Sequence, residues 1–232
     1  GMNEVGEPFG RLVCQGMLNA PAPYCSDCNS EYHVDYFDSA CPSCGKELSS
    51  RSAKMSKSLG NTVSPEEMIS KFGADTVRLF ILFGANPEAG MDWSDSALEA
   101  NHRQIKSLFD AIDEAMALTV APSRIDGWLL SRMRESQNRW IEAMSNVSLR
   151  EGVMISHFEM LSDWNWYLRR GGLDRTSAMK FLEGWIPMLA PATPHIAEEF
   201  WEKFGENSLL AAHEITTLRI ESDDMHILAE EE

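Results

Sequence analysis

The 232-residue sequence has no apolar run that approaches the roughly 18 residues of a membrane-spanning helix. Its longest apolar stretch, residues 77–85, is interrupted by Arg78 and Gly84. The first residues lack the basic segment and apolar core of a secretory signal. Positive charge is scarce too: 20 Lys and Arg face 36 Asp and Glu, a net charge of −16. This balance argues against a nucleic-acid binder that depends on a basic field over its whole surface. We therefore expect a soluble, cytoplasmic, monomeric protein with no membrane contact.

The composition is that of an ordinary globular protein, with 44% hydrophobic and 24% charged residues. Its length suits one large domain or two smaller ones. Charge is unevenly distributed, because residues 121–180 hold 9 basic and 7 acidic residues, residues 1–120 hold 9 and 17, and residues 181–232 hold 2 and 12. The arginines of the net-basic segment form either a local face for an anionic ligand or ordinary solvated helix faces.

From Ser64 onward the sequence carries the start and stop signals of helices. Ser64-Pro65-Glu66-Glu67 predicts a short helix that ends near Gly73, and apolar residues predict a second helix over residues 74–83. Longer amphipathic helices follow, with the three- and four-residue spacing of one buried face. Their expected starts are Ser96, Ser123, Ser148, Asp174 and Thr193. Short loops join them, so residues 94–205 are predicted to form an antiparallel bundle. A weak two-residue alternation at 215–220 precedes an acidic end.

Four of the five cysteines form two closely spaced pairs, Cys25-x-x-Cys28 and Cys41-x-x-Cys44, with twelve residues between the pairs. Two such turns can bring four thiolates together as a closed tetrahedral site, so the spacing predicts structural zinc. Disulfides are the alternative, and a reducing cytosol disfavours them. His33 lies between the pairs and could replace one thiolate. The fifth cysteine, Cys14, is expected to be a small buried apolar residue.

The string Lys54-Met55-Ser56-Lys57-Ser58 places two lysines three residues apart among small hydroxyl residues. Two ammonium groups with interleaved hydroxyls suit the binding of a polyphosphate. The alternative is a plain Lys/Ser surface loop.

The residues around this string carry a longer pattern. Leu59-Gly60-Asn61 follows it, and after the capped helix come Gly73-Ala74-Asp75 and Arg78-Leu79. This combination resembles the class I aminoacyl-tRNA synthetases. Four further stretches resemble the leucyl-tRNA synthetases in particular, and the resemblance extends from residue 7 to about residue 205. These stretches are Glu7-Pro8-Phe9-x-Arg11-Leu12 with Gln15-Gly16-Met17, Asp92-Trp93-Ser94-Asp95-Ser96, His102-Arg103, and Pro194-His195-Ile196-Ala197-Glu198-Glu199-Phe200-Trp201.

The resemblance implies a ligase that forms leucyl-adenylate and pyrophosphate from leucine and ATP, and then transfers the leucyl group to tRNA(Leu). Carried onto this sequence, Lys57 would be the main contact to the phosphates of ATP, which binds with Mg²⁺. Lys54 and Ser56 would support the loop and the nucleotide, in an ATP-binding string that runs from Lys54 to Ser58. The family's second phosphate motif, His-x-Gly-His, matches none of the six histidines. We therefore expect the chain not to activate leucine by itself.

The resemblance also divides the chain into segments. Residues 1–62 would be the end of a catalytic domain, with the zinc ribbon at 25–44 and the lysine string at 54–58. Residues 63–93 would be a helical stem-contact segment, residues 94–205 an anticodon-binding helical bundle, and residues 206–232 an acidic tail or the start of a further domain. The expected fold is mainly α-helical, with a small zinc-ribbon β segment.

The implied bundle would pack along the tRNA, where phosphate contacts position RNA without reading its bases. The net-basic segment makes Arg132, Arg139, Arg169 and Arg170 the candidates for these contacts. Tryptophans of the bundle could stack on bases, but their helical spacing places them in the core. They are Trp164, Trp166, Trp185 and Trp201.

Two other interpretations stay open on the sequence. The valyl, isoleucyl and methionyl enzymes share the lysine string and the bundle, although the Trp-Ser-Asp-Ser and Gln-Gly-Met stretches favour the leucyl enzymes. Alternatively, the chain is a zinc-ribbon helical module that binds RNA or protein and catalyses nothing. The intact lysine string argues against that alternative, because a binding module has no need for a phosphate-binding loop.

Overall fold

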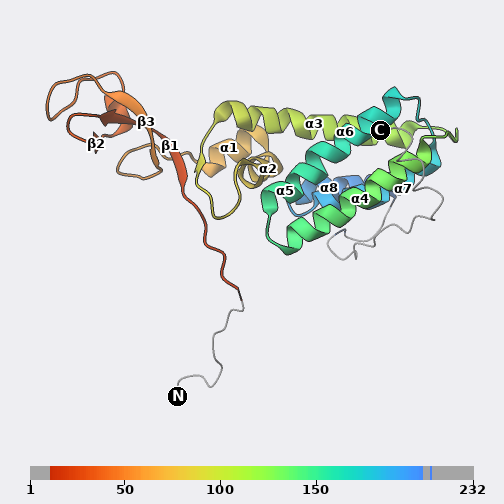
Figure 1. Ribbon diagram of the computed structural model, residues 1–232. Helices are drawn as coiled ribbons and strands as arrows, with labels where there is room; N and C mark the ends of the chain where they lie inside the picture. The colour runs from red at the N-terminus through yellow and green to blue at the C-terminus, as the bar shows by residue number, and fades with distance from the viewer. Residues whose placement is uncertain (1–10, 206–209, 211–232) are drawn as a thin grey trace, which may run out of the picture. The chain divides into compact units, whose positions relative to one another are not determined.

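The computed structural model describes residues 11–205 and Leu210 (Figure 1). The chain forms two compact units. Of the described residues, the sheet unit comprises those up to Ser64 together with Ala85–Trp93, and the helical unit comprises Pro65–Gly84 and those from Ser94 onward. The expected segment 63–93 is divided between the two units. Its helices pack with the bundle, and its last nine residues, 85–93, belong to the sheet unit. The expected alternation at 215–220 and the acidic end lie outside the described residues.

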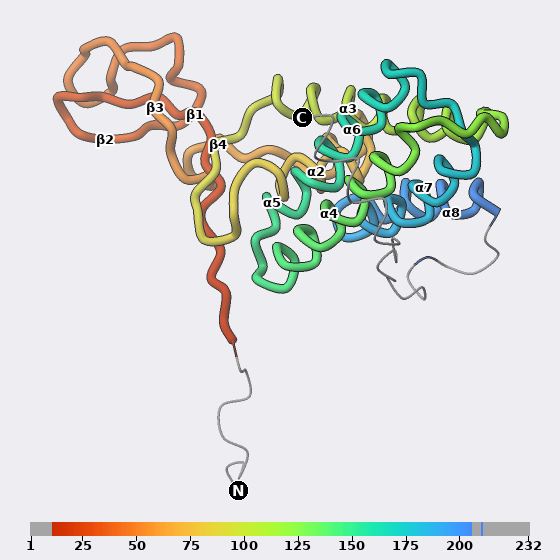
Figure 2. The backbone as a smooth tube through the Cα atoms, turned by 45° about the vertical axis from the view of Figure 1, so that its right-hand side comes forward, coloured from red at the N-terminus to blue at the C-terminus, as the bar shows by residue number. Residues whose placement is uncertain are grey.

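The sheet unit is built around strand β1, which pairs antiparallel with β2 and β3 and parallel with β4. Figure 2 shows β4 beside the start of β1. Pro21 and Pro23 lie in the middle of β1, where β3 is its only paired neighbour among the described strands. Proline lacks a backbone donor and is therefore tolerated at such a position. The bounds are β1 Leu18–Cys25, β2 Ser30–Glu31, β3 Ser49–Lys54 and β4 Met91–Asp92.

The helical unit confirms the predicted mainly α fold. Helix α7 lies against α3, α4 and α8, and α2 packs against α1, α3 and α5 (Figures 1 and 2). None of the helices in the described part of the chain has the length and apolarity needed to cross a membrane. The bounds are α1 Pro65–Phe72, α2 Ala74–Gly84, α3 Asp95–Ala117, α4 Asp126–Ser145, α5 Leu149–Met154, α6 Met160–Arg169, α7 Arg175–Leu189 and α8 Pro194–Phe204.

The ends of these helices follow local capping chemistry. Asp174 caps α7 by accepting a hydrogen bond from the Ser177 N–H at 2.9 Å, as the sequence predicted. Gly205 ends α8 in the left-handed conformation, with φ 104°. The prediction for α3 was wrong by two residues, because its cap is Ser94 and not Ser96. The Ser94 hydroxyl accepts the Ala97 N–H at 3.3 Å, whereas Ser96 lies inside the first turn.

One long helix was expected from Ser148 to Gly171, and the structure interrupts it. A π-helical turn, Ile155–Glu159, separates α5 from α6. Such a turn inserts an extra residue into the helical repeat. The apolar pattern does not reveal this turn, since apolar residues still recur at helix-like intervals on both sides.

The main core of the helical unit is aromatic. Trp164, Trp185 and Trp201 are buried, which confirms their expected place in the core. Trp166 is only partly buried, and its ring packs on Trp128 with 4.0 Å between the ring centroids. The rigid aromatic packing fixes the helix faces that carry the arginines described below.

Candidate functional site

The four paired cysteines converge at one end of the sheet. Cys25 ends β1, Cys28 follows in the next turn, and the other pair lies in the turn before β3. Their sulfur atoms all lie within 4.8 Å of one another, with Sγ–Sγ distances of 3.6 Å for Cys25–Cys44 and 3.8 Å for Cys28–Cys41. Four thiolates at the usual 2.3 Å from one tetrahedral ion would stand about 3.8 Å apart. The cluster is therefore dimensioned to hold a metal ion.

Hydrogen bonds and burial give the thiols of the cluster different pKa values. The Tyr32 hydroxyl lies 3.3 Å from Cys41 Sγ and 2.9 Å from Ser43 Oγ. Burial acts to raise the pKa of Cys41, but the Tyr32 hydroxyl and the Cys44 and Ser43 backbone N–H groups outweigh it and lower the pKa to about 6. Hydrogen bonding to Cys44, followed by burial, raises the pKa of Cys28 to about 12. Binding of a metal must therefore displace the proton of Cys28.

Neither of the other two candidates joins this cluster. His33 is not among the ligand atoms that converge there. Instead, its Nδ1 accepts a hydrogen bond from the Asp35 N–H at 3.3 Å. Cys14 is exposed, so its predicted burial is wrong. The reason is its position in the segment before β1, which belongs to no helix or strand.

The lysine loop, residues 54–60, begins where the sheet ends. Lys54 is the last residue of β3, and the following Met55 N–H donates to the Leu18 carbonyl at 3.1 Å. Lys57 starts a turn in which the Gly60 N–H donates hydrogen bonds to the Ser56 and Lys57 carbonyls. Both lysine side chains are exposed. The sheet therefore sets the position of one ammonium group and the turn sets that of the other.

Serine hydroxyls stabilise the turn from inside. Ser56 Oγ accepts the Leu59 N–H at 3.3 Å and lies 3.1 Å from Ser58 Oγ. These contacts fix the backbone between the two lysines before any ligand binds. A loop that is already ordered loses less conformational entropy when it binds a ligand.

A residue without an assigned role in the sequence prediction, Asn61, holds the loop to the sheet. Its side chain is 6% exposed, and Oδ1 accepts the Ser56 N–H at 2.9 Å. Its Nδ2 faces the carbonyls of Ala20, Ala53 and Lys54 at 3.2, 3.4 and 3.5 Å. One buried amide thus connects β1, β3 and the lysine loop. Its place directly after Gly60 was visible in the sequence, but its partners were not.

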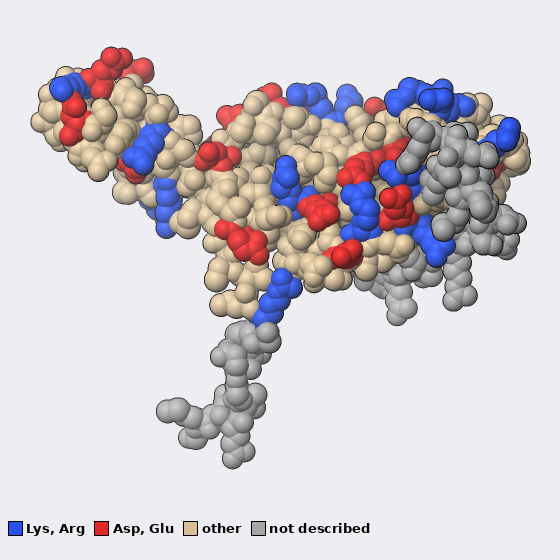
Figure 3. Space-filling view, in the orientation of Figure 1, with Lys and Arg blue, Asp and Glu red and all other residues tan. Residues whose placement is uncertain are grey.

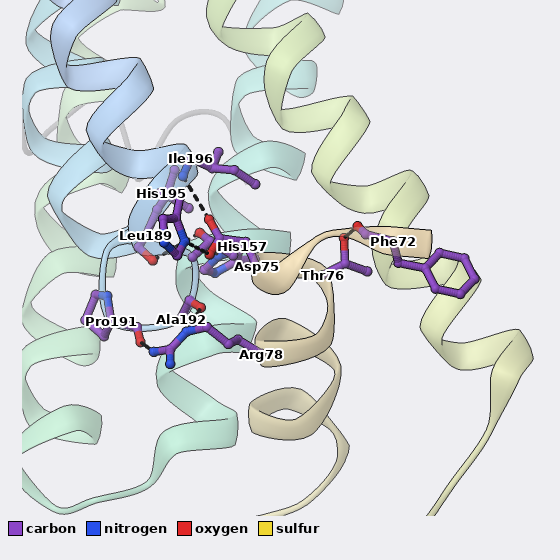
Figure 4. A network of polar contacts seen from close by, with 11 residues as sticks. Phe72, Asp75, Thr76, Arg78, His157, Leu189, Pro191, Ala192, His195 and Ile196 are labelled. Carbon is purple, nitrogen blue, oxygen red and sulfur yellow. Dashed lines mark hydrogen bonds and ion pairs between the residues drawn. The ribbon is translucent and has the colours of Figure 1, made fainter. Parts of the chain in front are cut away.

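The second signature string, from Gly73 to Leu79, has an architectural role in the helical unit (Figure 4). Asp75 on α2 accepts the Ile196 N–H and approaches His195 Nδ1, both at 2.8 Å, and so caps the start of α8. Arg78 donates to the carbonyls of Pro191 and Ala192 at 2.9 and 3.0 Å. Both side chains fasten α2 to the segment between α7 and α8.

A buried histidine that the sequence did not single out lies close to these contacts. His157 stands in the π-helical turn, with Nδ1 2.8 Å from Ser156 Oγ and Nε2 3.0 Å from Thr193 Oγ1. Burial lowers its pKa to about 3, against a smaller opposing hydrogen bond with the Val153 backbone. The imidazole is therefore neutral at pH 7 and serves packing between helices.

The structure separates the four candidate tRNA-binding arginines into two pairs. Arg132 contacts the carboxylates of Glu135 and Asp163 at 2.9 and 3.4 Å. Arg139 contacts Glu159 at 2.7 Å, and this hydrogen bond is the main cause of its raised pKa.

Arg169 and Arg170 are exposed at the end of α6. The Arg170 guanidinium lies 5.0 Å from the centroid of the Trp166 ring. Figure 3 shows basic side chains gathered over this end of α6. The end of α6 thus presents basic side chains beside a half-buried aromatic ring.

Comparisons with known proteins agree with both units. A family model described as the anticodon-binding domain of tRNA ligase matches residues 126–230. A second model, tRNA synthetases class I (I, L, M and V), matches residues 47–94, which include the lysine loop.

Among curated relatives, the leucine–tRNA ligase of Methanothrix thermoacetophila is 34% identical over 162 residues, which cover 66% of this chain and 16% of the relative. The leucine–tRNA ligase of Fusobacterium nucleatum is 31% identical over 228 residues, covering 90% of this chain and 26% of the relative. The chain thus spans between about a sixth and a quarter of the length of these relatives.

A solved structure is similar over most of the chain. It is the ternary complex of Agrobacterium radiobacter K84 agnB2 LeuRS with tRNA and LeuAMS, which matches with a TM-score of 0.59 and 27% identity over 71% of this chain and 22% of that one. The chain therefore belongs to the class I tRNA synthetases of the isoleucine, leucine, methionine and valine group, and within them it is a segment homologous to the leucyl-tRNA synthetases.

Proposed function

We propose that this chain is part of a cytoplasmic leucine–tRNA ligase, which activates leucine with ATP and transfers it to tRNA(Leu). The chain contributes the lysine loop and a tRNA-docking helical bundle. The observation that carries the proposal is the lysine loop, in which two exposed ammonium groups stand on a backbone fixed by β3, Ser56 and Asn61. The leucine–tRNA ligase names of the relatives support leucine as the amino acid.

In this proposal Lys57 contacts the phosphates of ATP where negative charge increases as leucine attacks the α-phosphoryl group. Lys54 contacts the same phosphates from the end of the sheet, and Met55, Ser56 and Ser58 complete the ATP-binding loop. Mg²⁺ that arrives with ATP supplies further neutralisation of the phosphate charge. A fixed ammonium group accelerates the reaction to the extent that its interaction is stronger in the transition state than with bound ATP.

The four cysteines fit structural zinc. Their sulfur spacing matches a tetrahedral thiolate site, and no side chain other than the four cysteines is needed to close it. The ion would cross-link the end of β1 to the segment that leads into β3. A cytosol that keeps thiols reduced favours metal binding over disulfides at such a site.

The helical bundle would dock tRNA at the end of α6. Arg169 and Arg170 are exposed there beside the Trp166 ring, whereas Arg132 and Arg139 contact carboxylates of their own chain and would have to exchange partners. We therefore place the first pair in direct phosphate contact and give the second pair a supporting role. The local basic face explains how a chain of net charge −16 can approach RNA.

The test is leucine-dependent ATP–pyrophosphate exchange, measured with this chain and the remaining part of the ligase. Lys57→Met should lower the exchange rate by about 10²–10³-fold, as when one preorganised charge-stabilising donor is lost. Lys71→Met, which neutralises an exposed lysine on α1, is the matched control and should leave the rate unchanged. Exchange with valine, isoleucine or methionine but not with leucine would overturn the leucine assignment. Equal rates for the Lys57 variant and the wild type would overturn the role of the lysine loop.

A further inference from the structure

The segment between the two cysteine pairs touches the lysine loop. We call residues 29–40, between Cys28 and Cys41, the cysteine loop. Its Val34 N–H donates to the Leu59 carbonyl at 2.8 Å. Beside this bond, the His33 ring covers Gly60 so closely that a Cβ at position 60 would lie 2.3 Å from His33 Nε2. Two neighbouring residues of the cysteine loop therefore contact two neighbouring residues of the turn that carries Lys57.

The position of the His33 ring is itself fixed. Its Nδ1 accepts the Asp35 N–H at 3.3 Å and lies 3.1 Å from Asp35 Oδ2, at the start of a short 3₁₀ turn, Val34–Tyr36. The cysteine cluster holds both ends of the cysteine loop, because Cys28 and Cys41 flank it with their sulfur atoms 3.8 Å apart. A metal ion bound to these sulfurs would fix the span of the loop.

Gly60 is suited to this contact for two reasons. Its φ of 68° lies in the left-handed region that glycine adopts without strain. In addition, only a residue without a side chain leaves room for the His33 ring. By contrast, Gly45 and Gly73 also have positive φ, but a Cβ at either position would meet no atom within 4 Å. Among the described glycines with positive φ, only Gly60 therefore combines that conformation with a close approach.

We propose that the cysteine loop holds the lysine loop in position and that His33 is a positioning residue for Lys57. Metal binding at the cysteines fixes the cysteine loop, and the contacts from His33 and Val34 transmit that order to Leu59 and Gly60. The metal site therefore contributes to ATP binding without touching ATP. This role rests on the proposed phosphate contact of the lysine loop, whereas the contact between the two loops stands independently of it.

The first experiment measures amide hydrogen exchange at Leu59 and Gly60 in the zinc-loaded chain. His33→Ala should raise both exchange rates by about two- to tenfold, the range expected when one stabilising contact of hydrogen-bond strength is lost. Phe37→Ala removes an exposed ring from the same loop and should change neither rate. Equal zinc content and unchanged exchange in α3 would show that each variant is folded.

Two conservative variants separate the contact from the local turn. His33→Phe keeps a flat ring against Gly60 but loses the acceptor for the Asp35 N–H, whereas His33→Asn keeps an acceptor but loses the ring. Protection of Gly60 should return with phenylalanine and not with asparagine. The opposite result would mean that His33 stabilises only its own loop, and it would overturn the proposal.

Metal removal and a double variant complete the test. Chelation of zinc under reducing conditions should raise exchange at Leu59 and Gly60 while leaving α3 unchanged. Gly60→Ala should also raise exchange, and adding His33→Ala should then have less effect than it has in the wild type, because the collision is relieved. Strictly additive effects, or no response to chelation, would refute coupling between the loops.

Activity provides the last measurement. In leucine-dependent ATP–pyrophosphate exchange, His33→Ala should raise KM for ATP or lower kcat, and leave KM for leucine unchanged. If the wild type shows no leucine-dependent exchange but the loops remain coupled by hydrogen exchange, the proposed function fails and the positioning contact survives. If the ligase is active and the variant matches the wild type in both parameters, the positioning role is refuted.

Discussion

Replacing Asn61 tests whether one buried amide determines the conformation of the lysine loop. In Asn61→Ala the Ser56 N–H loses its acceptor, and a buried donor left without a partner costs about 1–3 kcal/mol. The three carbonyls that share Nδ2 at 3.2–3.5 Å are long contacts, and we assign them together about 1 kcal/mol. The expected local destabilisation is therefore about 2–4 kcal/mol.

Asn61→Asp separates the two halves of this interaction. The substitution keeps an acceptor for the Ser56 N–H, but it replaces the donor with an oxygen that faces three carbonyl oxygens. Because a buried carboxylate needs donors around it, we expect the variant to be no more stable than Asn61→Ala. If the Ser56 bond alone mattered, the aspartate variant would be as stable as the wild type.

The measurement must resolve the sheet unit, since a chain of two compact units does not guarantee a single unfolding transition. Hydrogen exchange at the amides of Ser56 and Met55 provides this resolution, and a cost of 2–4 kcal/mol corresponds to a rise in their exchange rates of about 30- to 1000-fold. Thr62→Ala, at the exposed neighbouring position, is the control and should leave these rates within about twofold of the wild type. A loop with unchanged exchange in Asn61→Ala would refute the assigned role.

Three further predictions concern other polar contacts. Tyr32→Phe removes the hydroxyl beside Cys41 and should weaken zinc binding by about 10–100-fold in a chelator competition, with unchanged affinity counting against the hydrogen bond. Asp75→Ala leaves the Ile196 N–H at the start of α8 without its acceptor and should cost the helical unit about 1–3 kcal/mol in urea unfolding, whereas a loss near zero would mean that water replaces the carboxylate. For His157, the folded pKa of about 3 lies below the unfolded value of 6.5, so the unfolded state binds the proton first and stability falls as pH decreases through 6.5. The loss at pH 5 relative to pH 7 should be about 2 kcal/mol more for the wild type than for His157→Asn, and parallel pH profiles would contradict it.

The amino-acid sequence predicts those parts of the fold that depend on residues close together in the chain. The cap at Asp174, the start of α8 at Pro194, its end at Gly205 and the meeting of two cysteine pairs all follow from residues a few positions apart. Thr193 precedes α8 as expected, but its side chain makes no capping hydrogen bond, and the distant Asp75 accepts the Ile196 N–H instead. The error at α3 arose because serine is a favoured cap residue at both positions 94 and 96, and residue type alone does not decide between them.

Contacts between distant residues could not be predicted in the same way. Asn61 meets Ala20 across forty-one positions, and Arg78 meets Ala192 across 114. No local pattern encodes either partner. The π-helical turn is a similar case, because it places His157 against Thr193 of another segment, and the apolar spacing of its own helix shows nothing unusual.

The two signature strings, residues 54–61 and 73–79, differ in whether their charged side chains are exposed or bonded within the protein. In the first string, Ser56 and Asn61 are hydrogen-bonded within the sheet unit and Gly60 makes room for His33, so the exposed ammonium groups of Lys54 and Lys57 are the charged groups it presents. In the second string, Asp75 and Arg78 are engaged with α8 and the segment before it. A residue of a signature string can thus act by holding the backbone that carries the charged side chains. It follows that neutralising Lys57 should reduce activity without loss of stability, whereas replacing Asn61 should reduce stability and, through the loop, activity.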